Sequence, residues 1–174
     1  MADFDPAVQL TLRHEGGFFH NPVTGEVVNY GITLRFVRDS GYSASADEAF
    51  IQNLTVLEAQ EIYRKYFWDR YNIGAIANQD LANKVFDLTV NMGPGGKAAD
   101  GGLTLLQRAV NDAGGNCAVD GQLGPKSIGQ INALDPAKLL AAYRQRAGTR
   151  YRTIASANPA LAGNLTGWLA RLDS

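Results

Sequence analysis

Two consecutive glycines, Gly16-Gly17, set the end of the first predicted helix in this chain. Residues 5–15 are typical of a helix, with Asp5 as its N-cap and Pro6 at its first position. Glycine adopts left-handed or open conformations without strain, so the helix is expected to stop after Glu15. A carboxyl group therefore lies at the edge of whatever cleft the next loop builds.

The rest of the chain is predicted to be mostly helical, with one small β-hairpin. The hairpin falls within residues 18–30, where Asn-Pro and Thr-Gly pairs supply turns and two valines supply strand formers. Thr55-Val56-Leu57-Glu58 is a capping box. Further helices are predicted over 34–40, 56–68, 79–92, 103–113 and 125–133, from residue 136 onward and from residue 164 onward. The fold class expected is α+β and mostly α-helical.

Composition excludes several classes of protein. With 174 residues, 45% apolar and 19% charged, the chain can bury a core as one domain or as two closely fused lobes. A formal net charge of −1 gives no support to a nucleic-acid partner. The single Cys117 excludes an internal disulfide, and His14 and His20 lack a third ligand at metal spacing, so we expect no metal and no cofactor.

The start of the chain has no secretory signal, and no apolar run approaches the ~20 residues of a membrane span. We therefore expect the protein to be synthesised and held in a cytoplasm. We also expect it to be a monomer.

Glu15 is the candidate catalytic group. We expect it to be partly buried beside Phe18, Phe19 and Tyr30. A carboxylic acid that keeps its proton near neutral pH is what protonation of a glycosidic oxygen requires.

The residues around Glu15, His14–Gly17 followed by Asn29–Thr33, resemble the N-terminal domain of glycoside hydrolase family 108. This is a lysozyme-like group of phage endolysins and bacterial secretion-associated muramidases. Tyr63–Trp68, Phe86–Pro94 and Val119–Pro125 fit the same family in order, as does the ending Gly167–Arg171, and the last two of these three blocks resemble its predicted peptidoglycan-binding half. The resemblance covers nearly the whole chain and implies a lysozyme-like fold. It also implies a catalytic lobe over 1–91 and a helical peptidoglycan-binding-like lobe over 92–174, packed into one compact unit.

The hairpin departs from the family pattern. Relatives commonly carry an aspartate after the hairpin proline, where this chain has Thr24, and a threonine where this chain has Val28. An inverting glycosidase needs a group opposite the acid to orient the attacking water. Thr24 can orient a water but cannot act as a base, whereas Glu26, the only carboxylate of the hairpin, could substitute. A solvated hairpin charge is an equally good interpretation of Glu26.

Tyr30 and Asn91 are candidates for substrate binding. Asn91 ends a predicted helix, so a C-terminal cap is its alternative role. Asp87 lies on the same predicted helix and is expected to bond inside the protein.

The resemblance implies a muramidase that cuts the β-1,4 bond between N-acetylmuramic acid and N-acetylglucosamine, with Glu15 as the general acid. It implies peptidoglycan glycan strands as the partner and a phage endolysin as the setting. Such a protein is held in the cytoplasm of the bacterial host, is delivered by a separate holin or export factor, and acts in the periplasm or cell wall after release. Two alternatives stay open: a lytic transglycosylase, which uses one acidic residue and leaves 1,6-anhydro ends, and a non-catalytic wall-binding module.

Overall fold

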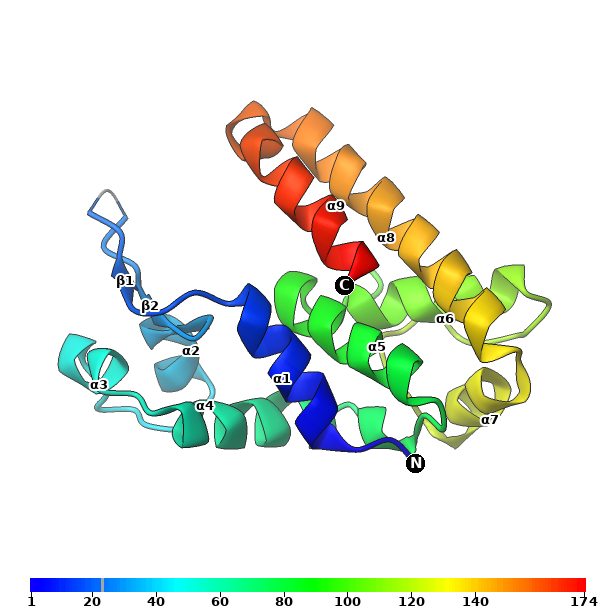
Figure 1. The fold of residues 1–174 in the computed structure, drawn as a ribbon, viewed down its shortest axis with the longest axis horizontal. Helices are drawn as coiled ribbons and strands as arrows, with labels where there is room; N and C mark the ends of the chain where they lie inside the picture. The colour runs from blue at the N-terminus through cyan, green and yellow to red at the C-terminus, as the bar shows by residue number, and fades with distance from the viewer. Residues whose placement is uncertain (23) are drawn as a thin grey trace.

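A computed structural model describes residues 1–22 and 24–174 and shows the predicted α+β class, mostly helical with one small antiparallel sheet (Figure 1). The strands are β1 (Phe19–His20), β2 (Val27–Asn29) and β3 (Ile32–Thr33), paired in the order β1-β2-β3. The hairpin predicted from the sequence is thus part of a three-stranded sheet.

The helices begin and end as follows: α1 (Phe4–His14), α2 (Leu34–Asp39), α3 (Glu48–Gln52), α4 (Val56–Tyr63), α5 (Gln79–Met92), α6 (Gly102–Asp112), α7 (Pro125–Ala133), α8 (Pro136–Ala157) and α9 (Leu165–Asp173). A π-helical segment, η1 (Arg64–Asp69), continues α4, and two short 3-10 helices follow at η2 (Ile73–Ala75) and η3 (Pro159–Asn164). Within the described residues, none of these helices is both long and apolar enough to cross a bilayer.

The first helix begins earlier than its sequence suggests. It starts at Phe4 with Asp3 as the N-cap, so the prediction of Asp5 at that position is wrong and Asp5 lies in the first turn. Its end is as predicted, because Glu15 is the C-cap residue.

The turn between β2 and β3 has the geometry that a tight hairpin requires. Asn29 pairs with Ile32, so Tyr30 and Gly31 form a two-residue loop, with φ angles of 50° and 75°. Left-handed values at both positions are those of a type I′ turn, for which glycine is well suited. The turn brings Gly31 up to the end of α1.

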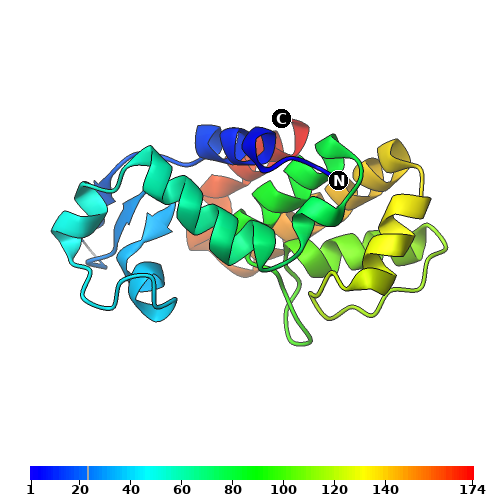
Figure 2. The same cartoon turned by 90° about the horizontal axis from the view of Figure 1, so that it is seen from below.

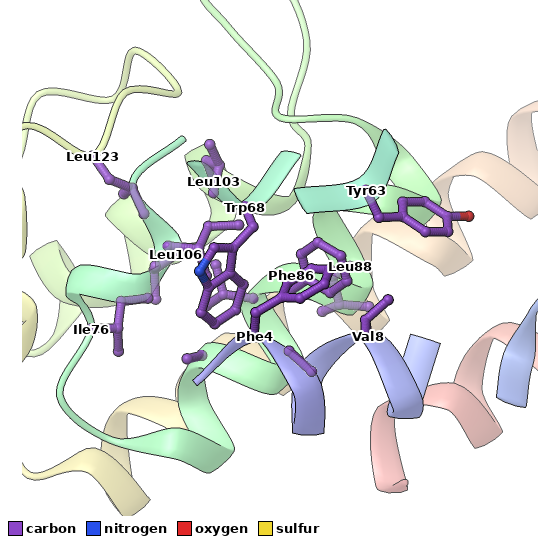
Figure 3. Packing of buried hydrophobic residues seen from close by; sticks show 14 of the residues in the cluster. Phe4, Val8, Tyr63, Trp68, Ile76, Phe86, Leu88, Leu103, Leu106 and Leu123 are labelled. Atoms are coloured by element: carbon purple, nitrogen blue, oxygen red, sulfur yellow. The ribbon is translucent and has the colours of Figure 1, made fainter. Parts of the chain in front are cut away.

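The core is centred on α5, which packs against α1 on one side and against α6 and α8 on the other. Phe4, Trp68 and Phe86 meet edge to face in this core, with ring centroids 5.6 to 5.7 Å apart (Figure 3). The same apolar cluster continues to Tyr143 on α8. Helices from both ends of the chain therefore bury side chains in one core.

Seen from below, the sheet lies at one end of the molecule and α7 at the other, with α5 between them (Figure 2). Helix α9 runs back along α8 and ends close to α1 and α5 (Figure 1). This return brings the last residues of the chain next to the end of the first helix.

Candidate active site

Glu15 lies where the first helix gives way to the loop that leads to the sheet. Its backbone N–H donates to the carbonyl of Thr11 at 3.1 Å, and its side chain is 18% exposed. The β1-β2 hairpin and the α8-α9 pair stand on either side of this helix end (Figure 1). The partial burial expected for Glu15 is present.

The residues that bury Glu15 differ from those expected. Phe18 and Phe19 are 40% and 55% exposed, and neither lines the hollow beside Glu15. Phe19 lies on β1, a two-residue strand at the edge of the sheet. The covering groups come instead from Gly31 and from Arg171 of α9.

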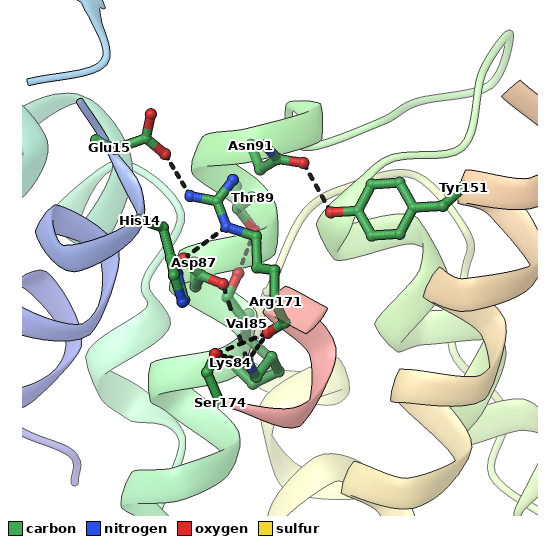
Figure 4. Close-up of polar contacts among 10 residues, drawn as sticks. All are labelled: His14, Glu15, Lys84, Val85, Asp87, Thr89, Asn91, Tyr151, Arg171 and Ser174. Atoms are coloured by element: carbon green, nitrogen blue, oxygen red, sulfur yellow. Dashed lines mark hydrogen bonds and ion pairs between the residues drawn. The ribbon is translucent and has the colours of Figure 1, made fainter. Parts of the chain in front are cut away.

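Arg171 holds one oxygen of the Glu15 carboxylate. Its Nη2 donates to Glu15 Oε1, and its Nε lies 3.3 Å from Asp87 Oδ1 (Figure 4). Arg171 is only 8% exposed, and the other carboxyl oxygen of Glu15 points away from the guanidinium. A planar guanidinium is well suited to bridge two carboxylates, because it presents several N–H donors in a fixed geometry.

Asp87 is the buried anion of this network and is fully inaccessible. Its Oδ1 also lies 3.0 Å from His14 Nδ1, and its Oδ2 lies 3.9 Å from Lys84 Nζ. Buried charges require such partners, because an isolated ion in a protein interior costs several kcal/mol. Asp87 therefore bonds inside the protein, as its place on a buried helix predicts.

Lys84 ties the end of α9 to α5. Its Nζ donates to the backbone carbonyl of Arg171 at 2.6 Å and to Ser174 Oγ at 3.3 Å. Burial lowers the pKa of Lys84 to about 8, although the charge of Asp87 opposes this shift. The guanidinium that contacts Glu15 is thus held through its own backbone as well as through its side chain.

Gly31 sets how closely the sheet approaches Glu15. A Cβ at this position would lie 2.5 Å from Glu15 Oε2 and 2.7 Å from the hydroxyl of Tyr63. That hydroxyl donates to the Tyr30 carbonyl at 2.7 Å, and burial raises the pKa of Tyr63 well above its usual value, so it remains a neutral donor.

A hollow of about 620 Å³ opens beside Glu15. It is lined by Arg13, His14, Glu15, Asn91, Gly163, Asn164, Gly167, Trp168 and Arg171. The structure thus brings Asn91 together with Glu15. Asn91 is not a helix cap, because Gly93 caps α5 and Asn91 Oδ1 accepts a hydrogen bond from the Tyr151 hydroxyl at 2.7 Å.

Glu26 and Thr24 line a second hollow, of about 590 Å³, between the hairpin and α2. The two hollows share no lining residue. Within the hairpin turn, Thr24 Oγ1 accepts a hydrogen bond from the backbone N–H of Glu26 at 3.3 Å, and both residues are exposed. The structure therefore does not place these two side chains in the hollow that contains Glu15.

Tyr30 contributes its backbone to the site. Its carbonyl accepts from Tyr63, while its side chain packs against the apolar core and does not line the hollow beside Glu15. Among residues 1–22 and 24–174, no group of three His, Cys, Asp or Glu side chains is arranged to hold a metal ion.

Arg171, Tyr63 and Trp168 are the site residues that sequence reasoning misses. Arg171 contacts Glu15, which lies 156 positions earlier in the chain, and nothing near Arg171 in the sequence indicates that contact. The one available signal is weak: an arginine in the last turn of a short amphipathic helix, next to Leu172. Arg171 reaches Glu15 only because α9 packs back along α8.

Two family models match this chain, one in each half. The family model described as "Glycosyl hydrolase 108" matches residues 8–93, and the model described as "Predicted Peptidoglycan domain" matches residues 101–173. Among curated proteins, none matches this chain. The solved structure of Brucella abortus SagA is similar, with a TM-score of 0.76 and 20% identity over 98% of this chain and 89% of that chain. At this level of identity the likeness shows a shared fold.

Proposed function

The chain belongs to the glycosyl hydrolase 108 family, and we propose that it is a muramidase in which Glu15 is the general acid. The bond cut is the β-1,4 bond between N-acetylmuramic acid and N-acetylglucosamine of peptidoglycan. One observation carries the assignment: Glu15 lies at an open hollow while Arg171 and Gly31 fix its carboxyl group from two sides.

The arrangement suits donation of a proton from one specific oxygen. Glu15 Oε1 is engaged by Arg171, so Oε2, which points away from the guanidinium, is the oxygen we assign to the proton donor. Arg171 also meets the buried Asp87, so its positive charge has a partner whether or not Glu15 carries a proton. Proton transfer to the glycosidic oxygen would then allow the sugar to leave through an oxocarbenium-like transition state.

For the attack of water, which in an inverting enzyme accompanies protonation of the leaving oxygen, we propose that Glu26, helped by Thr24, orients the water, while Asn91 and Tyr30 bind substrate. Inverting glycosidases hold their two carboxyl groups about 6.5–9.5 Å apart. Because Glu26 lines a separate hollow, this role requires the glycan to reach from α1 to the hairpin. Glu26→Gln should lower turnover at least tenfold, since general-base catalysis contributes at least that much. Full activity of this variant would remove Glu26 from the mechanism.

A lytic transglycosylase is the second candidate, and one observation favours it. Glu15 is the only carboxylate among the described residues that line its hollow. A transglycosylase needs one acidic group, because the 6-hydroxyl of the muramoyl residue attacks in place of water.

Mass spectrometry of the products separates these possibilities. Purified protein is incubated with purified peptidoglycan, and the soluble fragments are analysed. The muramidase proposal predicts fragments with reducing N-acetylmuramic acid ends. Fragments with 1,6-anhydro ends would identify a transglycosylase, and a complete lack of soluble fragments would indicate a wall-binding module.

The biological setting that we propose is a phage endolysin held in the host cytoplasm and delivered to the wall by a holin or an export factor. The predicted peptidoglycan domain supports peptidoglycan as the substrate. Co-expression with a holin should cause lysis that expression of the enzyme alone does not cause. Lysis without any holin would contradict this setting.

A further inference from the structure

The hollow beside Glu15 has an aromatic wall that comes from the far end of the chain. Trp168 of α9 lines this hollow together with Glu15 and Asn91. Its indole lies nearly parallel to the ring of Tyr151 on α8, with centroids 5.2 Å apart and an interplanar angle of 19°. Tyr151 is buried, so it forms a fixed support behind the half-buried indole.

The same tyrosine fixes an amide in the hollow. Its hydroxyl donates to Asn91 Oδ1 at 2.7 Å (Figure 4). This bond orients the amide, and the NH₂ group of Asn91 has no acceptor among the residues that the structure describes. An oriented donor next to an aromatic ring is a suitable partner for the carbonyl of an acetamido group.

Next to Trp168, two glycines line the hollow without placing a side chain in it. Gly163 and Gly167 line the hollow, and a Cβ at either position would meet nothing within 4 Å. Glycine is a poor helix former, and no close contact requires it at position 167 inside α9. What the two glycines provide is open space next to the indole.

We propose that this hollow is a subsite for one N-acetylhexosamine ring, with Trp168 as its stacking surface and Asn91 as the donor to its acetamido carbonyl. A pyranose ring has an apolar C–H face, and stacking this face on indole removes apolar surface from water. The volume of about 620 Å³ is within the range of small-ligand sites. The inference rests on the proposed function and extends it, because it gives the C-terminal half a direct part in holding the glycan beside Glu15.

The first test needs no tryptophan variant. Chitotetraose, four linked N-acetylglucosamine units, is titrated into the Glu15→Gln protein, in which cleavage cannot follow binding. The chain has two tryptophans, and Trp68 is 5% exposed, so acrylamide quenches mainly the emission of Trp168. We expect chitotetraose to protect Trp168 from quenching in a saturable manner.

The second test changes the wall of the hollow, again in the Glu15→Gln protein. Trp168→Leu should weaken chitotetraose binding at least tenfold by calorimetry, and Trp168→Phe should weaken it less because an aromatic ring remains. Gly167→Leu should also weaken binding, because it fills the open space without touching the indole contact with Tyr151. A purely structural role of Trp168 would not respond to Gly167→Leu, which improves helix propensity.

A lack of protection, or affinities of Trp168→Leu and Gly167→Leu within twofold of the parent protein, would overturn the subsite. The release of soluble fragments by wild type, measured in parallel, keeps the two proposals apart. An active wild type whose Trp168 is not protected would refute the subsite and leave the muramidase proposal standing. An inactive wild type with a protected Trp168 would refute the muramidase and support the subsite.

Discussion

At the scale of single residues, Gly31 decides how closely the sheet can approach the carboxyl group of Glu15. Gly31→Ala would combine a left-handed φ of 75° with a Cβ only 2.5 Å from Glu15 Oε2. We expect a loss of stability above the about 1–2 kcal/mol that a left-handed alanine costs, and a large loss of activity.

Gly41→Ala is the matched control for this prediction. Gly41 has a φ of 74°, but a Cβ there meets nothing within 4 Å, and Gly41 lines neither hollow. This variant should show the backbone strain alone and keep most of the activity. Equal activity of the two variants would contradict the role given to Gly31.

Arg171 is the second residue that fixes the Glu15 carboxyl group. Arg171→Met would remove the partner of Glu15 and leave the buried Asp87 without its guanidinium, so we expect a loss of about 3–5 kcal/mol in unfolding free energy. The comparison is Arg146→Met, whose ion pair with Asp112 is largely exposed and should contribute at most about 1 kcal/mol. Urea denaturation measures both, and similar losses would show that the Arg171 network is not buried in solution.

At the scale of elements, local signals predicted those helices whose ends are marked in the sequence. The capping box at Thr55 and the proline at the start of α7 were both confirmed. Helix α3 was not predicted, because its five residues are too short to show a period, and its contact with β2 depends on the tertiary fold. The position of Glu15 at the end of α1 could be predicted from the sequence, whereas Arg171 and Trp168 reach the same hollow only through the return of α9 along α8.

Lys84, whose Nζ joins α5 to the backbone of α9, should make the unfolding free energy depend on pH. The pKa of Lys84 is about 8 in the folded protein and about 10.5 in the unfolded chain. Between these values the unfolded chain binds more protons, so this lysine makes the unfolding free energy rise with pH, by up to about 3 kcal/mol.

The measurement is the difference between wild type and Lys84→Met at pH 7.5 and pH 10, because this difference cancels the titration of other groups. We expect the wild type to gain stability relative to the variant as the pH rises. Lys97→Met, at an exposed lysine, controls for the loss of one positive charge. A wild type that instead loses stability relative to Lys84→Met would contradict the burial of Lys84.

At the scale of the whole molecule, both halves of the chain contribute to one core and to one hollow. A chain that ends at Asn158 would lack η3 and α9, and with them Arg171 and Trp168. We expect this truncated protein to be inactive, to bind hydrophobic dyes and to melt without a sharp transition, because α8 loses a packing partner and Lys84 of α5 loses its hydrogen bond to Arg171. Arg171→Met in the full chain separates loss of the guanidinium from loss of the helix. A truncated protein with wild-type activity would show that α9 is dispensable.

Whether Glu15 donates the proton that cleaves the glycosidic bond is tested by the release of soluble fragments from purified peptidoglycan, compared between wild type and Glu15→Gln. The amide keeps the shape of the side chain and removes only the transferable proton. We predict that the variant melts close to wild type and releases fragments at least about a hundredfold more slowly, the lower range for loss of a general acid. A folded Glu15→Gln protein that retains more than about a tenth of the wild-type rate would contradict the assignment.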